Sequence, residues 1–170
     1  FSDNSLAYGA YTLVVTATDT DGLTDSDQLS FTVNGVPSAP VVSITPDPAT
    51  TSDLLSANIT TPSVDPEGAT VGYDYVWLKD NVVQPNQTGQ SIAATDTLKG
   101  EQWTVQVTPN DGIADGTYGE ASITVQNTAP TVSAVAITPA TGLYNDVVYT
   151  CTATVNDPDV WLPLYARRGW

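Results

Sequence analysis

The chain has 170 residues, with 19 Asp and Glu against four Lys and Arg, no His, and a formal net charge of −15. The absence of His excludes Ser-His-Asp triads, Cys-His pairs and imidazole metal ligands, and the scarcity of cations argues against binding to nucleic acid. No run approaches the roughly 18 apolar residues of a membrane helix, so we expect no membrane insertion. The polar residues are mainly Thr, Ser, Asn and Gln, which favour strands and turns.

Short patterns recur at intervals of 90 to 93 residues. The pairs are Val15-Thr16 and Val107-Thr108, Thr32-Val33 and Thr124-Val125, Ala39-Pro40 and Ala129-Pro130, Ile44-Thr45-Pro46 and Ile137-Thr138-Pro139, and Asp65-Pro66-Glu67 and Asp157-Pro158-Asp159. A fixed period indicates tandem repeats. We therefore expect the C-terminal part of one repeat over 1–37, a complete repeat over 38–128, the N-terminal part of a third over 129–159, and an atypical tail over 160–170.

Within the first piece, four acidic residues are closely spaced: Asp19, Asp21, Asp25 and Asp27. Clustered carboxylates supply the oxygen ligands that calcium prefers. The spacing does not fit an EF-hand, because Ala17 and Gln28 would occupy its first and last positions. A hairpin turn in which Asp21-Gly22 provides the positive φ angles explains the same residues without a metal, and we favour it.

Apolar residues alternate with period two between the Pro-containing junctions at 35–40 and 127–130. Strands are expected over Val41 to Thr45, Leu55 to Thr61, Val71 to Lys79, Ser91 to Ala94, Gln102 to Thr108, and Ser122 to Gln126. Gly, Pro, Asn and Asp separate these segments, and none has helical periodicity. About seven short strands in about ninety residues indicate a β-sandwich.

Three aromatic residues share one face of the strand that ends at Lys79, namely Tyr73, Tyr75 and Trp77. Aromatic side chains at this spacing on a central strand are expected to belong to the core. The alternative is a platform for a sugar ring. Cys151 aligns near Ile59, an apolar position, so we expect a buried free thiol.

Trp77 and the polar turn after it resemble the third strand of an immunoglobulin-like domain. The segment 96–112 resembles that fold's penultimate strand, with Trp103 where many members carry Tyr. The junctions, the Asp-Pro-acid turns and the ending Leu29–Asn34 are similar to the tandem Ig-like, PKD-like and cadherin-like repeats of large bacterial surface proteins. The resemblance implies an all-β fold of immunoglobulin-like β-sandwich repeats, one complete and two partial, located outside the cell or on its surface.

Several cadherin-like repeats bind calcium between neighbouring repeats, where turns like Asp65-Pro66-Glu67 contribute ligands. The resemblance therefore adds Asp65 and Glu67 to the candidate calcium ligands, and the alternative for this turn is a solvated loop. No other cofactor is expected.

We expect a non-enzymatic stalk or spacer whose partners are the neighbouring repeats of the same chain and a cell-surface protein or glycan. One alternative is a calcium-stiffened adhesive repeat, and another is a carbohydrate-binding module attached to a secreted enzyme. The repeat pattern stops after Asp159, and the tail holds Arg167 and Arg168, the only arginines, so we expect it to be foreign to the repeats. The alternative is a basic-aromatic peptide that docks a partner.

Overall fold

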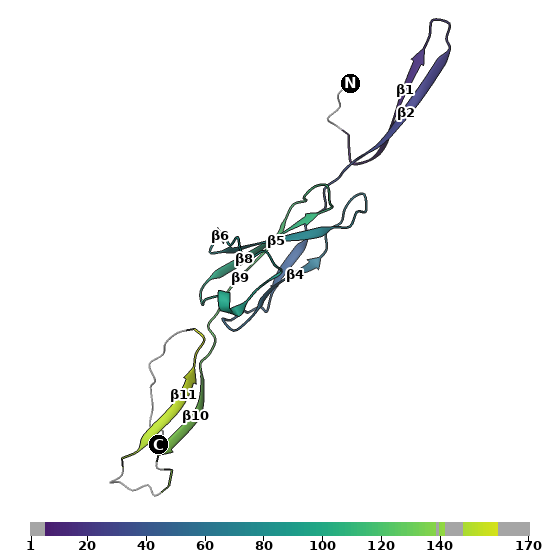
Figure 1. Cartoon of the computed structure of the whole chain (residues 1–170). Coiled ribbons are helices and arrows are strands. Elements are labelled where there is room, and N and C mark those ends of the chain that lie inside the picture. The colour runs from purple at the N-terminus through teal and green to yellow at the C-terminus, as the bar shows by residue number, and fades with distance from the viewer. Residues whose placement is uncertain (1–5, 139, 142–147, 160–170) are drawn as a thin grey trace.

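A computed structural model describes residues 6–138, 140–141 and 148–159. The described chain is all-β and extended, with a central two-sheet body between two hairpins at opposite ends (Figure 1). Its only helical element is the single 3-10 turn η1 (Ala94–Asp96). In this part of the chain no helix is long and apolar enough to cross a membrane. The expected tail over 160–170 lies outside the described residues.

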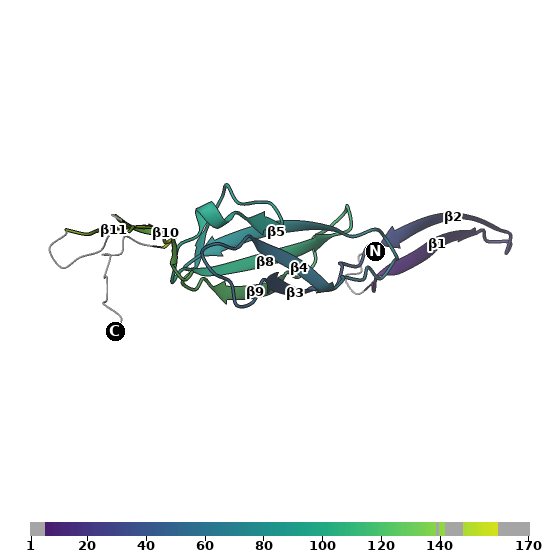
Figure 2. The ribbon, with the colours of Figure 1, turned by 90° about the horizontal axis from the view of Figure 1, so that it is seen from below.

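The central body contains two antiparallel sheets that face each other (Figure 2). The first has the order β3 (Val41–Thr45), β4 (Leu55–Thr61), β7 (Ser91–Ile92), and the second has the order β6 (Val82–Val83), β5 (Gly72–Lys79), β8 (Gln102–Asn110), β9 (Gly119–Thr124). The expected all-β sandwich architecture is confirmed at this level. The sequence predicted the bounds of β3 and β4 correctly.

The core between the two sheets is built around two tryptophans. Trp77 on β5 and Trp103 on β8 are fully buried and meet edge to face, with ring centroids 6.3 Å apart. The Trp77 Nε1–H donates to the carbonyl of Gly89 at 2.9 Å, so its polar atom is satisfied. Tyr73 and Tyr75 pack partly buried against this core, which confirms the core interpretation of the three aromatics. An aromatic pair of this kind adds about 0.5–1.5 kcal/mol beyond its area burial.

Some local features differ from the sequence expectation. The short strand β6 was not predicted, and it follows a turn in which Asp80 and Asn81 both have positive φ, 49° and 66°. These angles match the primed turns of two-residue hairpins. The predicted strand Ser91 to Ala94 ends early, at Ile92, because η1 begins at Ala94.

The N-terminal hairpin consists of β1 (Gly9–Thr18) and β2 (Thr24–Val33). The N–H of Asp19 donates to Leu23 O at 2.9 Å, and the N–H of Gly22 donates to Asp19 O at 3.2 Å. Gly22 has φ +84°, whereas Asp21 is not among the described residues with positive φ. The hairpin turn is confirmed, but it is a three-residue loop closed by a glycine bulge, which needs only one positive φ.

The C-terminal hairpin pairs β10 (Thr131–Thr138) with β11 (Thr150–Asn156) and has an irregularity between Ser133 and Ala136. Cys151 on β11 is a free thiol and is exposed. The expectation of a buried thiol was wrong. The repeat predicts which face of the strand Cys151 occupies, but no described strand packs on that face.

Candidate functional site at the two junctions

The segment that joins the N-terminal hairpin to the central body is held by hydrogen bonds from both sides. The N–H of Gly35 donates to Glu67 Oε2 at 2.9 Å, and Asn34 Nδ2 donates to Asp111 Oδ2 at 2.8 Å. Further along, the N–H of Ser38 donates to Val64 O at 3.0 Å. We call the hydrogen bonds made by Asn34 and Gly35 the first clamp.

The turn that carries Glu67 is shaped by its own aspartate. Asp65 Oδ1 accepts hydrogen bonds from the N–H groups of Glu67 at 3.0 Å and Ala69 at 2.8 Å. Pro66 fixes φ at the first corner of the turn, and Gly68 adopts φ +79° at its end. Asp65 therefore orders the turn, and Glu67 is the residue of the turn that contacts the linker.

Steric contacts tighten the same junction. A Cβ added to Gly35 would lie 3.0 Å from Pro66 Cγ and 3.0 Å from Tyr8 Cβ. A Cβ added to Gly116 would lie only 2.1 Å from the carbonyl oxygen of Pro37. The linker backbone passes so close to the central body that glycine is required at position 116.

The second junction has a related arrangement, which we call the second clamp. The N–H of Thr128 donates to Asp159 Oδ2 at 2.5 Å, and Asp159 is held in turn by its own N–H, which donates to Asp157 Oδ1 at 2.9 Å. Thr51 Oγ1 donates to Asp159 Oδ1 and lies 2.8 Å from Thr128 Oγ1. The acid after Asp157-Pro158 thus contacts both the linker and the central body.

The two clamps are built from equivalent positions. In each, the last residue of an Asp-Pro-acid turn accepts a backbone N–H from the linker that precedes the turn: Glu67 from Gly35, and Asp159 from Thr128. In each, an asparagine donates to the next carbonyl: Asn34 to Gly35 O at 3.0 Å, and Asn127 to Thr128 O at 2.8 Å.

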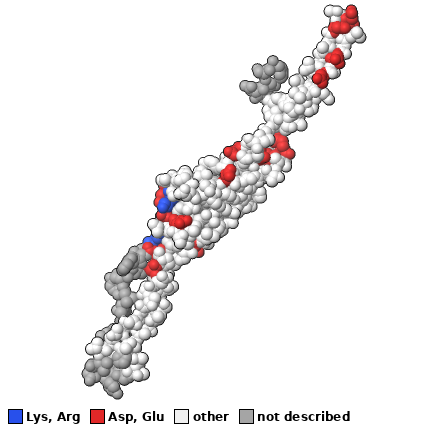
Figure 3. Space-filling view, in the orientation of Figure 1, with Lys and Arg blue, Asp and Glu red and all other residues white. Residues whose placement is uncertain are grey.

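Charge at the first junction is mainly negative. Figure 3 shows acidic side chains at the tip of the N-terminal hairpin and at the end of the central body that faces this hairpin. Hydrogen bonds from the backbone N–H of Ala114, from the Asn34 side chain and from the N–H of Ile113 lower the pKa of Asp111. The ionised form of Asp111 is therefore the form that the junction stabilises.

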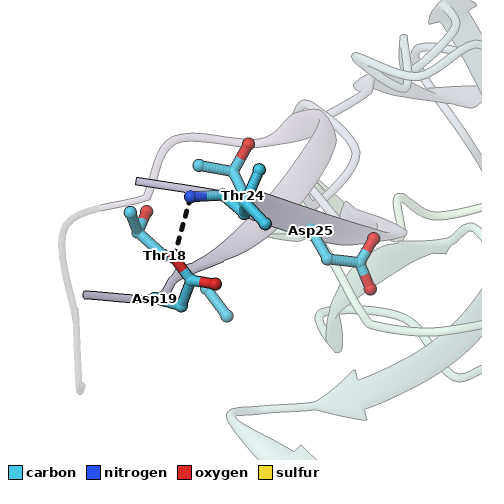
Figure 4. A pocket seen from close by; sticks show the side chains of 6 residues that line it. Thr18, Asp19, Thr24 and Asp25 are labelled. Atoms are coloured by element: carbon cyan, nitrogen blue, oxygen red, sulfur yellow. Dashed lines mark hydrogen bonds between the residues drawn. The ribbon is translucent and has the colours of Figure 1, made fainter. Parts of the chain in front are cut away.

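Of the four hairpin carboxylates predicted as calcium ligands, three accept hydrogen bonds from backbone N–H groups close to them in the chain. Asp19 Oδ1 accepts from the N–H groups of Asp21 at 2.9 Å and Leu23 at 2.8 Å, while Asp25 and Asp27 each accept from the next residue in the chain. Figure 4 shows the shallow hollow at this end of the hairpin, where the carboxylates of Asp19 and Asp25 stand apart. Within the described ranges, no group of three or more His, Cys, Asp or Glu is arranged to hold a metal ion.

Asp65 and Glu67 lie in a different part of the molecule from the hairpin acids, at the first clamp. Asp65 is 6% exposed, and its Oδ2 is buried without a hydrogen-bond partner among the described residues. Buried polar atoms in proteins normally have a hydrogen-bond partner. Among the predicted calcium ligands, this oxygen is therefore the one atom whose unfavourable burial an added ligand would offset.

Comparisons with protein-family models, with curated proteins and with solved structures find no match to this chain.

Sequence reasoning singled out the Asp-Pro-acid turns but not their partners. Asn34 and Asp111 are 77 residues apart, and no local pattern links them. One sequence pattern could have identified the asparagines of the two clamps: an asparagine recurs before each junction, at Asn34 and Asn127. No sequence pattern singled out Thr51, because its contact with Asp159 depends on how two distant segments of the chain pack together.

Proposed function

We propose that this chain is a non-enzymatic stalk or spacer segment of a large extracellular or cell-surface protein, built from tandem immunoglobulin-like repeats. The observation that carries the proposal is the equivalence of the two clamps, Gly35 with Glu67 and Thr128 with Asp159. A stalk of tandem repeats needs the same contact at each junction, so that every repeat has a fixed orientation relative to the next one. The partners of such a segment are its neighbouring repeats and, for adhesion, a surface protein or glycan.

The strand order supports an immunoglobulin-like assignment of the central body. Three strands in the order β3-β4-β7 face four in the order β6-β5-β8-β9, and the buried Trp77 lies on β5, the third strand of this body. Sandwiches of this class pair such sheets around a tryptophan on the third strand. The fold alone does not define a ligand.

The register of the hairpins supports the repeat assignment. In β1–β2, Tyr11 pairs with Phe31 and Leu13 pairs with Leu29. In β8–β9, the pairs Trp103 with Ile123 and Val105 with Ala121 are displaced from these by 92 residues on both strands. We infer that β1–β2 is the last hairpin of a preceding repeat.

The mechanism is resistance to bending. A net contribution of about 0.5–1.5 kcal/mol is typical for one hydrogen bond, and about 1.5–3 kcal/mol for a bond to a charged group. Pro37 and the glycine contacts reduce the conformations of the first linker further, because proline fixes φ and extends the preceding residue. Several weak restraints acting together hold neighbouring repeats in one orientation.

The calcium-stiffened adhesive repeat is the second candidate. It is favoured by one observation, the buried and unpartnered Asp65 Oδ2 next to the first clamp. Calcium titration separates it from the metal-free clamp. The carbohydrate-binding alternative has no such observation in its favour, since Trp77 is buried in the core.

Small-angle X-ray scattering of the dilute chain tests the stalk proposal. We expect an extended particle with little flexibility. The double variant Glu67→Ala/Asp159→Ala should broaden the distribution of dimensions, because it removes the acidic acceptor from both junctions. Glu120→Ala/Asp74→Ala is the matched control, since it removes the same charge from strands of the central body. Equal flexibility of the wild type and the clamp variant would refute the proposed mechanism.

A further inference from the structure

The first clamp contains the only Asn-Gly pair of the chain, Asn34-Gly35. In such a pair the backbone nitrogen of the glycine can attack Cγ of the asparagine side chain, because glycine has no Cβ to obstruct the approach. Packing favours glycine at this position, since Gly35 is buried and an added Cβ would lie 3.0 Å from both Pro66 Cγ and Tyr8 Cβ. The close packing of the junction therefore places a chemically reactive pair of residues inside the clamp.

The second clamp has an asparagine in the equivalent place but not the same reactivity. Asn127 donates to the next carbonyl as Asn34 does. The residue after Asn127 is Thr128, however, and its stiff β-branched side chain hinders attack by its own backbone nitrogen. The two junctions thus differ chemically at one position, and Asn127 is an internal reference for Asn34.

Both reacting groups of the pair are held by hydrogen bonds. The N–H of Gly35 donates to Glu67 Oε2 at 2.9 Å. Asn34 Nδ2 donates to Asp111 Oδ2 at 2.8 Å and to Gly35 O at 3.0 Å. Attack requires the Gly35 nitrogen to lose its proton and the Asn34 side chain to release Nδ2, so these bonds must break first. The closed clamp therefore opposes the reaction.

The two carboxylate partners add an electrostatic barrier. The attack passes through an anionic nitrogen and an anionic tetrahedral intermediate, and a neighbouring negative charge disfavours both. Glu67 contacts the attacking nitrogen, and Asp111 contacts the leaving nitrogen. Hydrogen bonds, above all from the N–H of Ala114, lower the pKa of Asp111, so this carboxyl group is ionised near neutral pH. Position and charge in the closed clamp thus act in the same direction.

We propose that Asn34-Gly35 is a site of hydrolytic deamidation that the closed first clamp protects and the open clamp exposes. The Gly35 nitrogen bonds to Asn34 Cγ and loses its proton to solvent, while Nδ2 takes up a proton and leaves as ammonia. Water then opens the resulting succinimide ring at one of its two carbonyls, which gives aspartate or isoaspartate at position 34. One water is consumed and one ammonia is released, with no oxidant or reductant.

The conversion changes the clamp irreversibly. The amide that donated to Asp111 becomes a carboxylate, so a donor facing an acceptor is replaced by two negative charges facing each other. Isoaspartate also adds a methylene group to the main chain, directly before Gly35, where the neighbouring side chains leave little space. A junction that stays open long enough to react therefore cannot close again in the same way.

Mass spectrometry with peptide mapping, after incubation of the full chain near neutral pH, tests the protection. Asn34 should react at least about tenfold more slowly in the folded wild type than in the urea-unfolded chain, since one hydrogen bond to a charged group corresponds to roughly that factor. In the folded chain, Glu67→Ala should raise the rate, and Glu67→Gln, whose amide oxygen still accepts the N–H, should raise it less. Asp74→Ala removes a carboxylate from β5 and should match the wild type. Asn127 should stay unmodified throughout.

Amide hydrogen exchange at Gly35 tests the consequence. Asn34→Asp should reduce the protection of this N–H by about tenfold or more, whereas Asn127→Asp, at the second clamp, should leave it unchanged. Equal deamidation rates in the folded and unfolded wild type would overturn the proposal, as would a slower reaction in Glu67→Ala or unchanged exchange in Asn34→Asp. These measurements do not depend on the role of the chain as a stalk, which the scattering experiment judges separately.

Discussion

The backbone N–H of Gly35 donates a 2.9 Å hydrogen bond to Oε2 of Glu67, which joins the linker to a turn of the central body. The acceptor side chain belongs to a turn that Asp65 orders, so the linker is held by a prearranged group and not by a mobile loop. Thr128 and Asp159 repeat the relationship at the other end of the body. A backbone-to-carboxylate hydrogen bond therefore links successive parts of the chain at each junction.

Substitution of Gly116 by alanine should destabilise the first junction. The added Cβ would lie 2.1 Å from Pro37 O, so either the linker or the 109–116 turn must move. We expect a loss of about 1–3 kcal/mol in the free energy of unfolding, as for other overpacked sites. Chemical denaturation measures it. Gly89→Ala is the control, because nothing lies within 4 Å of a Cβ there, and an equal loss in both variants would contradict the packing described.

Leucine-to-alanine substitutions should have very different effects in the central body and in the hairpin. Leu55→Ala removes a fully buried side chain and should cost about 2–5 kcal/mol of unfolding free energy. Leu13→Ala removes a side chain that is 48% exposed, so in the dilute chain its effect should stay within about 0.5 kcal/mol. Thermal and denaturant unfolding compare the two. Similar losses would mean that the hairpin face is already covered in the single chain.

Acid should weaken the first clamp. Because hydrogen bonds lower the pKa of Asp111 in the folded chain, its contribution is present above the unfolded value of about 3.9 and is lost as pH falls through the lower folded value. Asp111→Asn lacks this contribution. The difference in melting temperature between wild type and Asp111→Asn should therefore be constant near neutral pH and shrink in strong acid. A difference that grows on acidification would contradict this sign.

Calcium should leave the thermal stability of the chain unchanged if the clamps work without metal. Magnesium at the same concentration controls for ionic strength. A ligand that binds only the folded state raises the melting temperature once its concentration exceeds its Kd. A calcium-specific rise that disappears in Asp65→Asn would contradict the metal-free clamp and support the calcium-stiffened alternative.

The sequence predicted the strands whose alternation and flanking turns are both clear, such as β3 and β4. It missed β6, because two valines have no periodicity, and it placed Cys151 in a core because alignment specifies a face but not whether that face is covered. It assigned positive φ to Asp21 because a two-residue turn was assumed where the loop has three residues. The bond between Asn34 and Asp111 depends on how the hairpin and the body pack, which no local pattern encodes.

Distance measurement by double electron–electron resonance across the first junction tests the clamp most directly. Spin labels at Ser26→Cys and Val82→Cys, in a Cys151→Ser background at low concentration, report the orientation of the N-terminal hairpin relative to the central body. We expect a narrow distance distribution that broadens in Glu67→Ala and stays narrow in Glu67→Gln, whose amide oxygen still accepts the Gly35 N–H. A broad distribution in the unsubstituted junction, or no change on Glu67→Ala, would contradict it.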